Sequence, residues 1–131
     1  MLVSVFNKEI KKVLKGLKKL TKKSNHIGMD KHCLIETGSN SLIFKGYFNF
    51  TEIRTKIDAG IKTEGSVVVK ISELDKICKK LKSNSSIRIK KFIDHNGKNY
   101  IEVSDGDISL YCSTTYEVSE YRKLEFDLLN T

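Results

Sequence analysis

Two successive stretches of this 131-residue chain carry the same order of hydrophobic patterns. In each stretch an alternating or β-branched strand precedes a helical pattern, and three further strand patterns follow the helix. The first stretch places its strands at 2–6, 33–36, 41–47 and 50–57. The second places them at 66–71, 86–92, 99–103 and 107–112, with turn signals at Asn96-Gly97 and Asp105-Gly106. The repeat predicts an α+β fold built from a duplicated β-α-β-β-β unit.

Each predicted helix has a narrow apolar face. The first follows Asn7, which we expect to be its N-cap, and the second follows Ser72, with Asp75 three residues later in a variant of the capping box. The apolar residues are Ile10, Val13, Leu14, Leu17 and Leu20 in the first helix and Leu74, Ile77, Cys78 and Leu81 in the second. Neither half can bury its helix and sheet faces well alone. We therefore expect two helices packed side by side on one side of antiparallel sheets, around a shared core.

Lysines occupy the face of each helix opposite the apolar residues. The chain has a net charge of +8 and a pI of about 9.4, which favours a polyanionic partner. Glu9 is the one acid on the first helix, whereas Glu73 and Asp75 make the second less one-sided. A single lysine is ordinarily a solvated surface residue. A helix face on which nearly all charges are positive, however, carries repulsion between its lysines, and a bound polyanion would relieve that repulsion. The candidate nucleic-acid contacts are Lys8, Lys11, Lys12, Lys15, Lys19 and Lys22 on the first helix, and Lys76, Lys79 and Lys80 on the second.

Four segments carry motifs in a defined order: VSVFNKEIKKVL at 3–14, LIFKGYFNFTEI at 42–53, EGSVVVKISELDKICKKL at 64–81 and IEVSDGDISL at 101–110. They resemble a first strand and helix, the strand pair L-x-L-x-G-T-D-L-E, the segment G-x-x-x-V-x-A-x-x-L-x-x-I-x-x-x-L and the closing hairpin V-x-S-G-x-x-x-F-x-L. The family with these motifs is the bacterial DNA sliding clamp, the beta subunit of DNA polymerase III, and the match is to its N-terminal domain. Two departures indicate a divergent member: Tyr47-Phe48 stand for Thr-Asp, and 25–28 stand for Leu-Pro-Ile-Leu.

The resemblance implies a DNA-clamp domain over residues 1–115. The tail, 116–131, looks like a linker toward a further domain and that domain's first strand. A subunit of the family carries three such domains and two subunits close a ring, so this chain is either a fragment or a standalone single-domain relative. A standalone domain needs roughly six copies to close a ring of the same size. The family also has a basic residue that meets DNA in the loop after the first helix, which corresponds to Lys22 or Lys23.

The function implied by the resemblance is that of a processivity factor, which holds duplex DNA without sequence preference and needs neither a catalytic group nor a cofactor. The partners implied are double-stranded DNA, other clamp domains or further copies of the chain, and a DNA polymerase or clamp loader. Family members recruit polymerases through a peptide groove outside the N-terminal domain. The alternative is a protein-interaction module with a clamp fold, such as a decoy or regulator of a host clamp or clamp loader.

The remaining residues favour no catalytic or metal site. The three cysteines, Cys33, Cys78 and Cys112, lack close spacing and are interpreted as buried free thiols, and the three histidines, His26, His32 and His95, do not lie at metal-ligand spacing. We expect the strand aromatics to be core residues rather than base-stacking platforms; these are Phe44, Tyr47, Phe48, Phe50 and Tyr100. No apolar run reaches the length of a membrane span, and the N-terminus does not resemble a signal peptide. We therefore expect a cytoplasmic protein that is not an enzyme, with no membrane partner.

Overall fold

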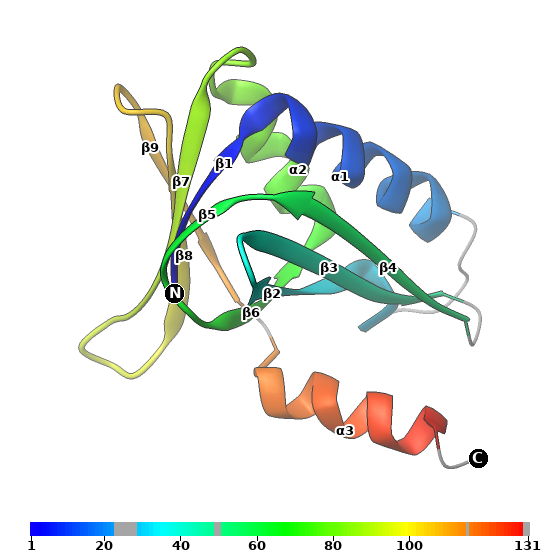
Figure 1. Cartoon of the computed structure of the whole chain (residues 1–131). Coiled ribbons are helices and arrows are strands. Elements are labelled where there is room, and N and C mark those ends of the chain that lie inside the picture. The colour runs from blue at the N-terminus through cyan, green and yellow to red at the C-terminus, as the bar shows by residue number, and fades with distance from the viewer. Residues whose placement is uncertain (23–28, 49–50, 115, 130–131) are drawn as a thin grey trace.

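The computed structural model describes residues 1–22, 29–48, 51–114 and 116–129. Its helices are α1 (Asn7–Lys22), the 3-10 turn η1 (Met29–Lys31), α2 (Ile71–Lys80) and α3 (Val118–Leu129). Its strands are β1 (Leu2–Phe6), β2 (His32–Gly38), β3 (Ser41–Phe48), β4 (Thr51–Asp58), β5 (Gly60–Thr63), β6 (Ser66–Lys70), β7 (Ser86–Ile93), β8 (Asn99–Ser104) and β9 (Ser109–Ser113). The predicted α+β class and the duplicated β-α-β-β-β order are confirmed (Figure 1).

The strands form two antiparallel sheets in which the halves of the chain are interlocked. The five-stranded sheet has the order β5-β1-β7-β8-β9, and the four-stranded sheet has the order β4-β3-β2-β6. The first strand of each half therefore lies in the sheet of the other half: β1 pairs with β7, and β6 pairs with β2. Neither half has a complete sheet without the other, which is why the chain forms one core.

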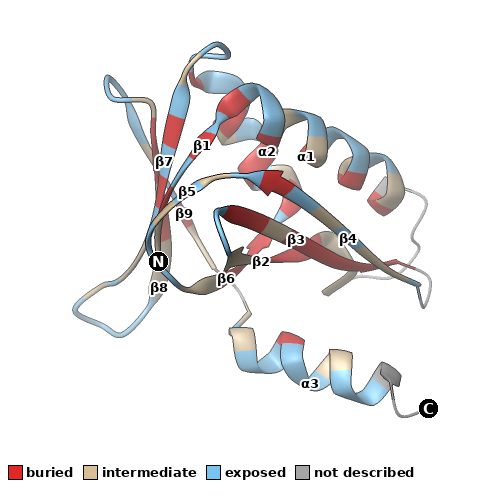
Figure 2. Ribbon diagram, in the orientation of Figure 1, coloured by how far each residue is buried: buried red, intermediate tan, exposed pale blue. Residues whose placement is uncertain are grey.

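Both helices pack against the inner faces of the two sheets, in one continuous core (Figure 2). α1 and α2 lie side by side, as predicted. Ile10, Leu14 and Leu17 of α1 and Leu74 and Cys78 of α2 are almost fully buried. The helical spacing of the apolar residues therefore identified the inward faces correctly.

The outer face of the four-stranded sheet is covered by α3 (Figure 1). Tyr121 is completely buried and stacks on Tyr47 of β3, with a ring-centroid distance of 5.4 Å. Arg122 donates a hydrogen bond of 2.5 Å to the Glu36 carboxylate, and Lys45 forms an ion pair of 2.7 Å with the same residue. The strand expected in the tail is thus wrong, because residues 118, 121 and 124 share one helical face that packs on the sheet.

Three further expectations were wrong in detail. Asn7 does not cap α1: it is buried, and its amide donates hydrogen bonds to the carbonyl oxygens of Cys78 (3.1 Å) and Lys82 (2.9 Å). Helix α2 begins at Ile71 without a side-chain cap, so Ser72 and Asp75 form no capping box. Strand β5 lies in a segment to which we assigned no strand, because four residues that begin with a glycine give too short a pattern to detect.

Two replacements of Tyr121 should distinguish the contribution of ring packing to stability from that of the hydroxyl group. Tyr121→Ala should lower the free energy of unfolding by about 3–5 kcal/mol, because it removes a fully buried ring. Tyr121→Phe should change it by less than about 1 kcal/mol, because the hydroxyl has no hydrogen-bond partner among the described residues. Urea denaturation followed by circular dichroism measures both. A Tyr121→Ala protein as stable as the parent would contradict the docking of α3.

Candidate nucleic-acid interface

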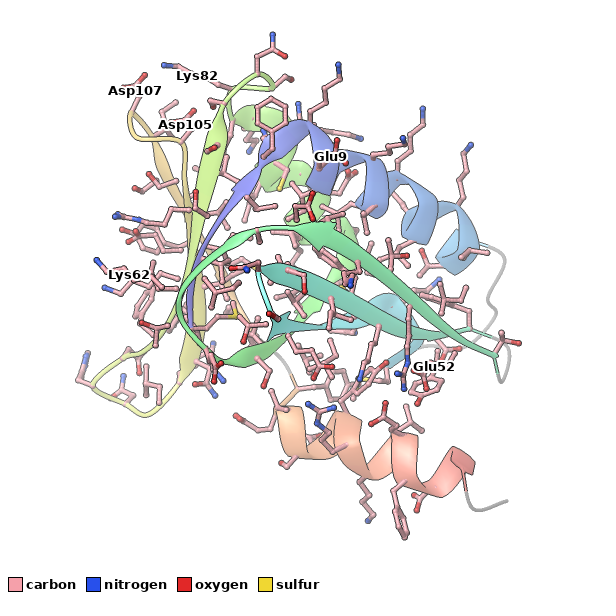
Figure 3. The ribbon with its side chains drawn as sticks, viewed as in Figure 1. Glu9, Glu52, Lys62, Lys82, Asp105 and Asp107 are labelled. Carbon is pink, nitrogen blue, oxygen red and sulfur yellow. The ribbon has the colours of Figure 1, made fainter. Side chains whose placement is uncertain are left out.

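Helix α1 presents a row of lysines to solvent on the side away from the sheets. The exposed members are Lys8, Lys12, Lys15 and Lys19. Figure 3 shows long, nitrogen-tipped side chains extending from α1, with Glu9 at the helix start. Burial of the apolar residues fixes this orientation, since the lysines occupy the remaining helical positions. The row lies on a regular element rather than a loop, so its spacing is fixed by the helix.

A groove between α1 and α2 collects cations from both helices. It has a volume of about 430 Å³ and is lined by Lys11, Lys15, Lys18, Asp75 and Lys79. Lys11 donates a hydrogen bond of 2.5 Å to Ser83, just beyond α2. Four lysines therefore surround one carboxylate, and the lining of the groove carries a net positive charge.

Asp75 connects the two helices across this groove. Its side chain is 2% exposed, and its carboxylate lies 3.1 Å from Lys18 Nζ and 3.0 Å from Lys79 Nζ. Burial by itself would raise the pKa of Asp75, but the hydrogen bonds from Lys79 and Lys18 outweigh burial and hold the pKa below its ordinary value. Lys79, a predicted DNA contact, thus already has a partner, and Lys18 is a groove residue that we did not select.

The structure distributes the predicted contacts unevenly. Lys15 and Lys79 line the groove together with the half-buried Lys11. Lys76 and Lys80 are exposed on α2 but do not line the groove. The side chain of Lys22 and all of Lys23 lie outside the described residues. At the end of α2, Lys82 forms an ion pair with Asp107, and its backbone N–H donates to Asp105 (Figure 3).

A second groove, between α1 and the edge strand β4, is mainly apolar. Its volume is about 400 Å³, and its lining includes Val13, Leu17, Leu20, Ile53 and Ile57. β4 ends the four-stranded sheet, so one side of its backbone has no strand partner within the described chain. An apolar groove beside an open strand edge is suited to association with another protein chain.

The cysteines and His32 lie in the protein interior rather than on the lysine-rich surface. Cys33, Cys78 and Cys112 are buried free thiols, as predicted, and burial raises the pKa of each to about 12. His32 is buried with its ring 4.7 Å from that of Tyr116, whereas His26 lies outside the described residues. Within the described part of the chain, no three His, Cys, Asp or Glu residues are grouped as metal ligands. None of the described helices is long and apolar enough to cross a membrane.

The fold is that of a DNA-clamp domain. No protein-family model and no curated protein sequence matches the chain, but solved structures of bacterial sliding clamps do. The Helicobacter pylori beta clamp bound to a DNA ligase peptide is 17% identical over 92% of this chain, with a TM-score of 0.78. The beta subunit of DNA polymerase from Streptococcus pyogenes is 19% identical over 92% of the chain, with a TM-score of 0.77. The Caulobacter crescentus beta sliding clamp gives 16% identity, 92% coverage and a TM-score of 0.78.

The particular protein whose fold this chain shares is thus the beta subunit of bacterial DNA polymerase III, the family that the sequence motifs resemble. The chain spans 30% to 32% of the length of these structures. The resemblance inferred from the four motifs is confirmed at the level of fold.

Asp75→Asn should destabilise the protein by about 1–3 kcal/mol at neutral pH, because it removes a charged partner from Lys18 and Lys79. The folded pKa of Asp75 is lowered, so its contribution is complete above the unfolded pKa of about 4 and is lost as the pH falls through the folded value. The difference between parent and variant should therefore shrink in acid. Urea denaturation at several pH values measures it.

Asp58→Asn, at the exposed end of β4, is the matched control and should show no such difference. A difference between parent and Asp75→Asn that does not change with pH would contradict the ion-pair account.

Proposed function

We propose that the chain is a sliding-clamp-type domain that holds duplex DNA against α1 and α2 without reading its sequence. The observation that carries the proposal is the concentration of lysines on one side of the fold. Helix α1 contains seven lysines and one glutamate, and the groove beside it adds Lys79 from α2. A surface of this charge attracts phosphates at any sequence.

Lysine is chemically suited to a contact that must slide. Each ammonium group is a hydrated point charge on a flexible stem, so it can move from one phosphate to the next without losing a fixed hydrogen-bond geometry. Binding releases counterions from the DNA, so affinity falls steeply with salt. The proposed role requires no catalytic group and no cofactor.

We further propose that copies of this domain, or this domain and like domains, associate head to tail through strand edges. β4 ends one sheet and β9 ends the other, so pairing of β4 with β9 of the next domain would continue the sheets. The apolar groove beside β4 could receive a side chain from the neighbouring domain, and Ile108, next to β9, is 49% exposed. Repeated head-to-tail contacts can close a ring. A DNA polymerase or a clamp loader is the partner expected of such a ring.

Neutralising two exposed lysines of α1 should weaken duplex binding. For the double variant Lys15→Gln, Lys19→Gln, the slope of log affinity against log salt should decrease by about 2, because about one counterion is released per phosphate contact. Fluorescence anisotropy with duplexes of two unrelated sequences measures this slope.

The double variant Lys56→Gln, Lys123→Gln has the same net charge but is altered on β4 and α3. It should bind duplex DNA as the parent does. Equal weakening in both variants would mean that net charge, rather than the helix surface, attracts the DNA.

Encirclement predicts dependence on DNA topology. The protein should remain on a nicked circular duplex at moderate salt and leave it after linearisation, because a closed ring can slide off only at an end. Light scattering should give a mass of roughly six copies for a ring with clamp geometry. Val13→Lys, which places a charge in the apolar groove, should abolish both effects.

A strict monomer that ignores the circle would contradict assembly by this chain alone. Tight binding to a host clamp or loader with weak DNA binding would instead indicate the protein-interaction module.

A further inference from the structure

The outer face of the five-stranded sheet, opposite the helices, carries three aromatic rings, one of which contacts the other two. Phe92 of β7 and Tyr100 of β8 are cross-strand partners whose rings stack at a centroid distance of 5.6 Å. Tyr111 of β9 meets Phe92 edge-on at 6.0 Å and is 57% exposed. The core position expected for Tyr100 is therefore wrong, because its neighbour Ile101 is the residue that points inward. Phe44, Tyr47 and Phe48 are buried as expected, and Phe50 lies outside the described residues.

Cations border these rings. Lys98 Nζ lies 5.6 Å from the centre of the Tyr100 ring, and Lys90 precedes Phe92 by two residues on the same face of β7. Arg88 lies two residues further, 3.9 Å from Glu102, which is the acid that the described strands place within this face. The sheet face therefore combines stacked rings with a positive border.

Small side chains beside Arg88 leave two hollows in the same face. One, of about 480 Å³, is lined by residues that include Ser4, Gly60 and Lys62. The other, of about 510 Å³, is lined by Ser4 and by serines of β7, β8 and β9, with Asp105 at its rim. Arg88 lines both hollows, so a guanidinium group and several hydroxyl groups are available there for an anionic group.

The two outer sheet faces differ in one respect. α3 covers the outer face of the four-stranded sheet (Figure 2). Its Tyr121 ring stacks on that of Tyr47. No described element covers the corresponding face of the five-stranded sheet, where Tyr111 is exposed and Phe92 and Tyr100 are half-buried.

We propose that this face binds single-stranded nucleic acid, with bases stacked on Tyr111 and Phe92 and phosphates paired with Arg88, Lys90 and Lys98. Aromatic rings can stack on a base only when its face is free, so the surface selects a single strand over a duplex. The positive border is complementary to the phosphate backbone. The site lies on the opposite side of the sheet from α1 and α2, so its existence does not depend on duplex binding by the helices.

The test measures the affinity of the full chain for a fluorescein-labelled oligothymidylate of about twelve nucleotides by anisotropy. Tyr111→Leu and Phe92→Leu keep an apolar side chain but remove the ring. Each should weaken binding about 5- to 150-fold, the range measured for base–aromatic stacking. The matched control is Phe126→Leu, an aromatic on α3 that is 65% exposed, which should leave the affinity unchanged. Oligouridylate in place of oligothymidylate distinguishes RNA from DNA as the preferred ligand.

Two comparisons separate this site from attraction by charge. An abasic oligomer of the same length has the phosphates without the bases and should bind much more weakly. The Lys15→Gln, Lys19→Gln variant should lose duplex affinity while retaining the oligothymidylate, and Tyr111→Leu should do the reverse. Equal binding of the abasic oligomer or of polyglutamate, or an unchanged affinity in both ring variants, would overturn the proposal even if the helices bind duplex DNA as expected.

Discussion

The exchange of first strands between the two halves is the constraint on which the rest of this structure depends. β1 leaves its own half to pair with β7, and β6 pairs with β2. Because each helix directly follows an exchanged strand, both helices begin on the same side of the interlocked sheets. Asn7 then joins the start of α1 to the end of α2 through hydrogen bonds to three backbone carbonyl groups. The lysines of the two helices are thus brought together by strand pairing far from them.

Two lysine-rich helices in contact repel one another, and the structure offsets this at a single buried carboxylate. Asp75 accepts from Lys18 on α1 and from Lys79 on α2, leaving one net positive charge among the three groups. Lys8, Lys12, Lys15 and Lys19 of α1 are exposed to solvent, where water and salt screen them. The remaining repulsion between these lysines is relieved when an anion binds, and this favours association with a polyanion.

The long-range features of this fold were predictable where periodicity extends over many residues. The α1 pattern, the β-branched β6 strand and the repeat itself determined the class and the inward helix faces. Shorter signals were insufficient: β5 has four residues, and the pattern of α3 depends on a sheet face that sequence alone does not reveal. Asp75 fitted a capping box locally, yet its partner Lys18 is 57 residues away. Tyr100 was wrongly assigned to the core because the alternation of side chains along a strand defines two sheet faces but does not show which face is buried.

The departure from the clamp motif at Tyr47 has a structural counterpart in α3. A threonine at this position, as in the resembling motif, would offer no ring for Tyr121 to stack on, and Tyr47 also donates a 2.6 Å hydrogen bond to Glu52. The same sheet face supplies Glu36 and Lys45, which pair with Arg122 and Glu125 of the helix. Tyr47 and α3 thus form one unit that closes the outer face of one sheet. No described helix covers the equivalent face of the other sheet, where the Phe92 ring contacts those of Tyr100 and Tyr111.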